Sequence, residues 1–178
     1  DGGKPHRRPG AVVPAVSPDT LSILKELERK ALWLSCWMIH HANHVRPSKD
    51  GLKVGGHQAS CASSVTALAA LYLNVLRPED RVAVKPHAAP VFHALQYLLG
   101  REPLDHLVNF RALGGAQSYP SRTKDADDVD FSTGSVGLGV GATLFAALAQ
   151  DYVRLHGWLP PDRPDGRMIA GMGDAELD

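Results

Sequence analysis

The stretch Met168-Ile169-Ala170-Gly171-Met172-Gly173-Asp174-Ala175-Glu176-Leu177-Asp178 decides the predicted fold. Its first five residues form a short apolar run, which is typical of a buried β-strand. A glycine and an aspartate follow, at the carboxyl edge of the expected sheet, where open α/β folds bind their ligands. A glycine lets a ligand come close to the backbone, and a carboxylate binds a hard cation that carries a diphosphate. The stretch therefore predicts an α/β fold with a diphosphate site at this edge.

The preceding sequence alternates helical and strand-like segments. Ser17-Pro18-Asp19 has the capping hydroxyl, the proline and the acidic residue that mark a helix start. Apolar periodicity and Gly or Pro stops predict helices over residues 17–42, 60–76, 90–99 and 136–156, a brief helix after Pro103, a strand over 81–85 and a long loop over 114–133. This order predicts a parallel sheet with helices on both faces.

Composition limits the class of protein. The 178 residues include 44% apolar and 21% charged residues, which fits a globular domain, and 19 basic residues balance 19 acidic ones. The balance gives no sign of a nucleic-acid partner, and no apolar run is long enough for a membrane helix. We interpret Cys36 and Cys61 as free thiols in a reducing cytoplasm. We expect residues 1–16 to form a flexible arm and residues 17–178 to form one partial diphosphate-binding domain.

Three turns marked by glycine or proline each precede a predicted helix. They are Gly55-Gly56-His57-Gln58-Ala59-Ser60, Lys85-Pro86-His87-Ala88-Ala89-Pro90 and Thr133-Gly134-Ser135-Val136-Gly137-Leu138-Gly139. Helix N-termini offer free N–H groups to anions, and glycines let phosphates approach. Two of the turns also carry a histidine, which titrates near neutral pH. Each turn alone is also compatible with a purely structural role.

The order of the motifs resembles the thiamine-diphosphate enzymes of the transketolase type. Within them, the chain is most similar to the N-terminal part of the homodimeric pyruvate dehydrogenase component of the 2-oxo acid dehydrogenase complexes. The resemblance rests on the following motifs, in family order from about residue 40 to the end: Gly56-His57-Gln58-Ala59-Ser60, Lys85-Pro86-His87-Ala88-Ala89-Pro90, Asn109-Phe110-Arg111, Gly114-Gly115-Ala116-Gln117-Ser118-Tyr119-Pro120, Ser135-Val136-Gly137-Leu138-Gly139 and Gly173-Asp174-Ala175-Glu176-Leu177-Asp178.

The resemblance implies three catalytic residues and one residue that lines the cofactor site. His57 and His87 match histidines that bind substrate oxygens and move protons beside the reactive thiazolium carbon. Tyr119 matches a residue near the substrate carboxylate, and Ser60 matches one that lines the cofactor site. Histidine donors suit a developing alkoxide.

The resemblance also implies a binding site for the diphosphate of the cofactor. Asp174 matches the aspartate that binds Mg²⁺ or Ca²⁺, and Gly173 matches the glycine that lets the diphosphate approach. Ser135 and Val136 match the turn that lies over the cofactor. Ala175 departs from the family, which has glycine there.

The implied activity is oxidative decarboxylation of a 2-oxo acid, pyruvate first, with acyl transfer to a lipoyl-bearing acyltransferase component. The implied full-length enzyme is a homodimer that also needs a pyrimidine-binding domain and a second metal ligand, an asparagine. Because neither is present before Asp178, we expect this chain alone to be inactive. Lys85 stands where the dehydrogenases carry an uncharged polar residue, and its role is open.

Two functional alternatives stay open. Transketolase-type ketol transfer between sugar phosphates uses the same cofactor, although the Ser118-Tyr119-Pro120 loop favours the dehydrogenase. A non-catalytic truncated remnant is the other alternative.

Three smaller patterns have structural interpretations. His40, His41 and His44 have a spacing that can bind zinc but also suits a helix C-terminus. Gly137–Ala142 formally fits a dinucleotide fingerprint but lacks the preceding strand. The acidic run of residues 125–130 is interpreted as a solvated loop, with a calcium site as the alternative.

Overall fold

The computed structural model describes residues 16–48, 50–126, 128–134 and 136–174. All but one residue of the arm expected over 1–16 lie outside the described residues, as do Ser135 and residues 175–178. The described part is a mixed structure of helices around a small parallel sheet of two strands.

The first helix, α1 (Pro18–His40), begins as the sequence predicts. Ser17 is its N-cap, and the Ser17 hydroxyl accepts a hydrogen bond from the Thr20 backbone N–H at 3.2 Å. The helix ends in a π-helical turn, η1 (His41–Val45), before the loop that leads to the second helix. The buried face of α1 includes Ala31 and Met38, which belong to the main apolar core.

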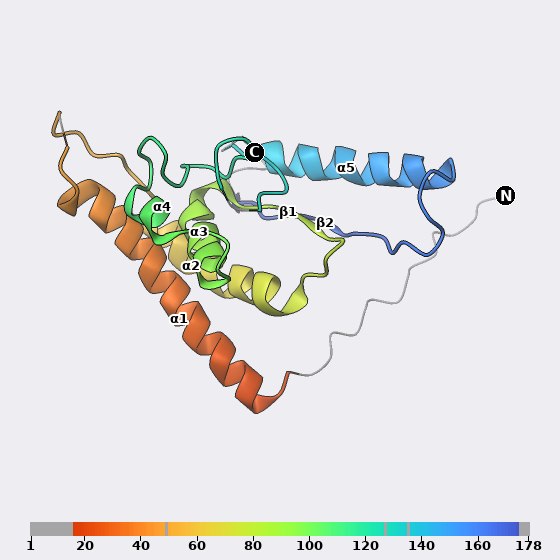
Figure 1. Cartoon of the computed structure of the whole chain (residues 1–178), viewed down its shortest axis with the longest axis horizontal. Helices are drawn as coiled ribbons and strands as arrows, with labels where there is room; N and C mark the ends of the chain where they lie inside the picture. The colour runs from red at the N-terminus through yellow and green to blue at the C-terminus, as the bar shows by residue number, and fades with distance from the viewer. Residues whose placement is uncertain (1–15, 49, 127, 135, 175–178) are drawn as a thin grey trace.

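Three more helices complete this core. They are α2 (Gln58–Ala70), α3 (Ala89–Leu98) and the short α4 (Leu104–Val108). A π-helical turn, η2 (Leu71–Val75), extends α2, and a 3₁₀ turn, η3 (Pro86–Ala88), leads into α3. Every residue of α3 from Ala89 to Gln96 is buried, which makes α3 the central helix of the core. Figure 1 shows α1 running along α2, α3 and α4.

The two strands join distant parts of the sequence. β1 (Arg81–Ala83) pairs in parallel with β2 (Met168–Ala170), so that Arg81 lies opposite Met168 and Ala83 opposite Ala170. The pairing continues past the strands through a hydrogen bond from the Gly171 N–H to the Ala83 carbonyl at 2.8 Å.

Consecutive residues of β1 pack against different helices, because side chains alternate between the faces of a strand. Val82 and Val84 share a buried cluster with Phe92 of α3. A Cβ on Gly139, in the first turn of α5 (Leu138–Leu155), would lie 3.0 Å from the Ala83 side chain. The small residues therefore bring α5 close to the sheet. Figure 1 shows α5 alongside β1 and β2, with α1 at the other side of the molecule.

The predicted helices are confirmed, with ends that differ by a few residues, and the two predicted strands are confirmed but shorter. Cys36 and Cys61 are free thiols, as interpreted, and Cys61 is buried. Among the described residues, no helix combines the length and the apolar character that crossing a membrane requires.

Candidate functional site

His57 stands just before α2, at the end of a tight loop. The loop needs two glycines, because Gly55 has a φ of +77° and Gly56 a φ of +137°. The Asn43 side chain holds Gly55 twice: its amide nitrogen donates to the Gly55 carbonyl and its oxygen accepts from the Gly55 N–H, both at 2.9 Å. A Cβ on Gly56 would lie 2.8 Å from two carbons of Ile39. The loop therefore presses on α1, and this fixes the backbone that leads into His57.

Arg111 clamps the same loop from the other side. Its Nη1 donates to the Val54 carbonyl at 2.6 Å. Its own backbone has a φ of +60°, a strained value for a residue other than glycine, and its N–H donates to the Ala116 carbonyl. Its Nε is buried without a hydrogen-bond partner within the described residues. The sequence motif contained Arg111 but gave it no role.

His87 and Tyr119 meet His57 although the three residues are far apart in the sequence. His87 lies in η3, directly after β1. The ring centroids of His57 and His87 are 4.4 Å apart, and those of His87 and Tyr119 are 6.3 Å apart. The Cys61 Sγ lies 4.0 Å from the His87 carbonyl oxygen, so α2 also packs behind this turn. The three residues predicted to be catalytic thus form one cluster, the His57–His87–Tyr119 cluster.

Burial and neighbouring charge both act on the pKa of His57. Desolvation lowers the pKa of His57, and the neighbouring His87 and the Arg111 guanidinium lower it further. Burial lowers the pKa of Arg111, which the nearby Tyr119 partly offsets. Because an unperturbed imidazole titrates near pH 6.5, His57 is mainly neutral at pH 7. A neutral imidazole can both accept and donate a proton.

Asp125 shapes the loop that carries Tyr119. Its carboxylate accepts from the Gln117 N–H at 2.9 Å and from the Ser121 N–H at 2.7 Å. These two bonds bracket Tyr119 and fix the turn around it. The interpretation of the acidic run as a solvated loop is therefore wrong for Asp125.

The same correction applies to the other end of the acidic run. Asp130 accepts a hydrogen bond from the Val82 N–H at 2.8 Å and lies 3.4 Å from the Arg81 guanidinium. Burial raises its pKa. The sequence pattern missed both contacts because each joins segments that are distant along the chain.

Two buried hydroxyls lack hydrogen-bond partners within the described part of the chain. They are the Ser60 Oγ in the first turn of α2 and the Thr133 Oγ1 in the loop before α5. Buried hydroxyls are normally satisfied by protein, water or ligand. Ser60 belongs to the predicted cofactor site, and Thr133 lies two residues before Ser135, where the turn that the motif order assigned to the cofactor begins. The two orphaned hydroxyls therefore fit a polar ligand.

The carboxyl edge of the sheet is more open. Gly173 is buried, whereas Asp174 is exposed and makes no hydrogen bond or ion pair with another described residue. Val136, at the start of α5, has an exposed fraction of 85%. A Cβ on Gly171 would lie 2.9 Å from the Lys85 backbone nitrogen, so the segments after β2 and β1 touch here. The roles predicted for Gly173, Asp174 and Val136 stay predictions, and Ser135 lies outside the described residues.

Metal ligands do not gather elsewhere in the part of the chain that the structure describes. It contains no group of three His, Cys, Asp or Glu side chains placed to hold a metal ion. The His40 and His44 rings stack on each other at 5.0 Å, and His41 stacks on Trp37. These contacts fit the structural interpretation of that histidine pattern.

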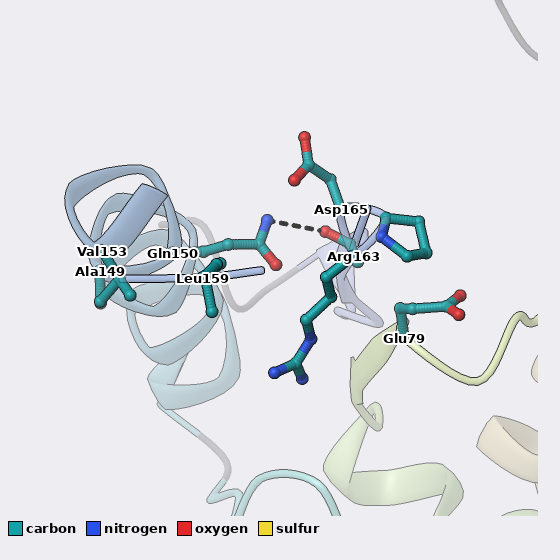
Figure 2. A pocket seen from close by; sticks show the side chains of 9 residues that line it. Glu79, Ala149, Gln150, Val153, Leu159, Arg163 and Asp165 are labelled. Atoms are coloured by element: carbon teal, nitrogen blue, oxygen red, sulfur yellow. Dashed lines mark hydrogen bonds between the residues drawn. The ribbon is translucent and has the colours of Figure 1, made fainter. Parts of the chain in front are cut away.

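A surface pocket lies apart from the cluster. It has a volume of about 230 Å³. Figure 2 shows it between α5 and the segment 159–166. The Gln150 side chain donates to the Gly166 carbonyl at 3.1 Å along its wall. None of the predicted site residues lines this pocket.

Comparisons with known proteins agree with the motif order. No family model matches the chain. Among curated proteins, the pyruvate dehydrogenase E1 component of Mycolicibacterium smegmatis is 33% identical over 157 residues, which are 82% of this chain and 16% of that protein. The E1 component of Mycobacterium tuberculosis is 31% identical over the same length, and that of Escherichia coli is 28% identical over 170 residues, 90% of this chain and 18% of that protein.

The similarity thus covers most of this chain, while the chain spans about a sixth of the length of the relatives it matches. The resemblance that the sequence motifs indicated is confirmed. This chain is therefore, over most of its own length, a relative of the pyruvate dehydrogenase E1 components.

Proposed function

We propose that the chain carries the substrate-facing histidines of a thiamine-diphosphate-dependent enzyme that oxidatively decarboxylates a 2-oxo acid, with pyruvate as the first choice. The convergence of His57, His87 and Tyr119 carries this proposal. Rings that are 30 residues apart in the sequence lie 4.4 Å apart between centroids, and the curated relatives are named pyruvate dehydrogenase E1 component.

In this proposal the cofactor rests between the histidine pair and the carboxyl edge of the sheet. The orphaned hydroxyls of Ser60 and Thr133 fit a polar cofactor on this side of the molecule. Gly173 and Asp174, with Ser135 and Val136, would hold the diphosphate and its Mg²⁺ or Ca²⁺, because a hard cation prefers oxygen ligands. When bound, thiamine diphosphate supplies the carbanion stabilisation that decarboxylation requires.

The chain's own groups then hold the substrate and move protons. His57 is mainly neutral at pH 7, so one ring nitrogen can accept a proton while the other donates. The Tyr119 hydroxyl is a donor for a substrate oxygen beside His87. The Arg111 guanidinium keeps the His57 loop in place through the Val54 carbonyl.

The wider assembly is also part of the proposal. We infer a parallel sheet covered on both faces, because Val82 and Ala83 pack against different helices. We also infer a homodimer, acyl transfer to a lipoyl-bearing acyltransferase component, and a reducing cytoplasm as the compartment. The 178-residue chain alone is proposed to be inactive, since the resemblance assigns the activating glutamate to another domain.

Two observations favour a non-catalytic remnant as the second candidate. Asp174 is exposed without a partner among the described residues, and Ala175 stands where the family has glycine. A methyl group there can crowd a diphosphate. Metal-dependent binding of the cofactor separates the two candidates.

The test is calorimetric titration of the chain with thiamine diphosphate in the presence and absence of Mg²⁺. We expect binding that requires Mg²⁺ and weakens by at least about tenfold, equivalent to ~1.4 kcal/mol, in Asp174→Asn. Asp162→Asn, at an exposed position without a proposed role, is the matched control. Mg²⁺-independent binding, or equal binding by both variants, contradicts the proposed metal role, and absent binding supports the remnant.

A further inference from the structure

His93 and Glu102 form a buried polar pair behind the His57–His87–Tyr119 cluster. His93 lies on α3, and Glu102 lies in the turn between α3 and α4. Both side chains have an exposed fraction of 0%, and the His93 Nδ1 lies 3.1 Å from the Glu102 Oε2. His106 approaches the other carboxyl oxygen at 3.8 Å. Because both side chains are buried, their polar atoms depend on hydrogen bonds within the protein rather than on water.

The second nitrogen of His93 reaches the loop that carries Tyr119. The His93 Nε2 lies 3.1 Å from the Gln117 carbonyl oxygen. Since a carbonyl oxygen only accepts, Nε2 must carry the hydrogen in this bond. The Nδ1 then either donates to an ionised Glu102 or accepts from a protonated one. A protonated Glu102 selects the neutral ring with its hydrogen on Nε2, whereas an ionised Glu102 stabilises the ring that is protonated on both nitrogens, and Nε2 is a donor in either state.

Gln117 is the point at which this pair acts on the cluster. It lies two residues before Tyr119, and Asp125 holds its N–H while His93 holds its carbonyl. The peptide groups on both sides of Gln117 are therefore fixed to residues outside the Tyr119 turn. The Tyr119 ring in turn lies 6.3 Å from the His87 ring.

We propose that Glu102 and His93 are positioning residues that hold Tyr119 beside His87. Glu102 orients the imidazole and stabilises a protonation state in which Nε2 is a donor, and the imidazole fixes the Gln117 carbonyl. Neither residue touches the substrate. The inference rests on the proposed function only for the role of Tyr119, because the placement of the ring is a property of the chain alone.

The experiment compares matched variants of the full chain by NMR. His93→Phe keeps the ring but removes the donor, and His93→Gln restores an amide N–H near the position of Nε2. Glu102→Leu removes the partner of Nδ1, and Glu102→Gln keeps a hydrogen-bonding group there. His156→Gln, at the exposed residue that directly follows α5, is the control.

Three signals report the arrangement: the His93 Nε2–H resonance, the cross-relaxation between the Tyr119 and His87 rings, and amide hydrogen exchange over residues 117–121. We expect His93→Phe and Glu102→Leu to lose the ring contact and to speed exchange by about tenfold or more, as for a lost buried hydrogen bond. We expect the conservative variant of each pair to keep the contact.

Two results would overturn the proposal. One is a Tyr119–His87 contact that survives in both disruptive variants. The other is equal loss in the disruptive and conservative variants, which would assign the pair a general role in packing. If one disruptive variant does not fold, the other position still decides. No cofactor is used, so failure here is distinct from failure of the proposed function.

Discussion

Gly56→Ala is the sharpest test of how the chain places His57. The change adds one methyl group at a backbone φ of +137°, where it would lie 2.8 Å from the Cγ1 and Cγ2 of Ile39. The positive φ costs about 1–3 kcal/mol for a residue other than glycine. Overpacking against Ile39 adds about 1–3 kcal/mol. We therefore expect the free energy of unfolding to fall by roughly 2–6 kcal/mol, the sum of the two costs.

Gly51→Ala separates the two costs. Gly51 has a φ of +72°, and nothing lies within 4 Å of a Cβ placed there. This control should lose only the backbone part, about 1–3 kcal/mol. Both variants are measured by urea unfolding followed by circular dichroism, and the His57 and His87 ring resonances report whether the histidine pair has moved.

A double-mutant cycle with Ile39→Ala completes the test. Removing the two carbons of Ile39 should relieve the clash, so Gly56→Ala should cost about 1–3 kcal/mol less in that background. If Gly56→Ala and Gly51→Ala destabilise the chain equally, and Ile39→Ala does not change the cost, the loop does not press on α1 as described.

Two substitutions and one labelling experiment test the electrostatics. Burial favours the protonated form of Asp80, but hydrogen bonds from two arginines outweigh burial and hold the pKa of Asp80 below the ordinary range. Asp80→Asn should therefore lower the free energy of unfolding in urea by roughly 1.5–3 kcal/mol. This contribution should be present above about pH 4 and fade as the pH falls further. Burial raises the pKa of Cys61 to about 12, so mass spectrometry after iodoacetamide treatment at pH 8 should find Cys36 modified and Cys61 intact. Burial, His87 and the Arg111 guanidinium all lower the pKa of His57, and Arg111→Met removes the last of these. The pKa of His57 in an NMR titration should therefore rise. An unchanged or lower pKa would contradict the position of the Arg111 guanidinium near His57.

The sequence could predict those features of the fold that depend on neighbouring residues in the chain. Ser17 caps α1 because the capping hydroxyl, the proline and the acidic residue all lie within three positions of one another. The predicted strand of residues 81–85 ends at Ala83, because pairing with β2 extends only to Ala170. Strand ends depend on the partner strand, which local sequence does not contain.

The histidine pair was predictable only through the order of the motifs. Each of His57 and His87 follows a common kind of turn, and neither turn alone points to the other. Their meeting depends on the packing of α1, α2 and α3, which carries the turn before α2 to the turn after β1. The resemblance supplied that long-range information.

The supporting residues escaped the sequence for the same physical reason. Asn43 and Arg111 hold the His57 loop from positions 12 and 57 residues away from their partners in the loop. Asp125 was interpreted with its acidic neighbours, although its backbone partners make it a structural residue. Residue type alone did not separate Asp125 from a solvated carboxylate.

The central claim is that the His57–His87 pair faces a bound thiamine diphosphate. The most direct measurement is an NMR titration of the imidazole resonances of the 178-residue chain with thiamine diphosphate and Mg²⁺. The account predicts saturable shifts at both His57 and His87, with the exposed His156 unchanged. Binding that leaves both rings of the pair unshifted, or shifts only His156, would contradict it.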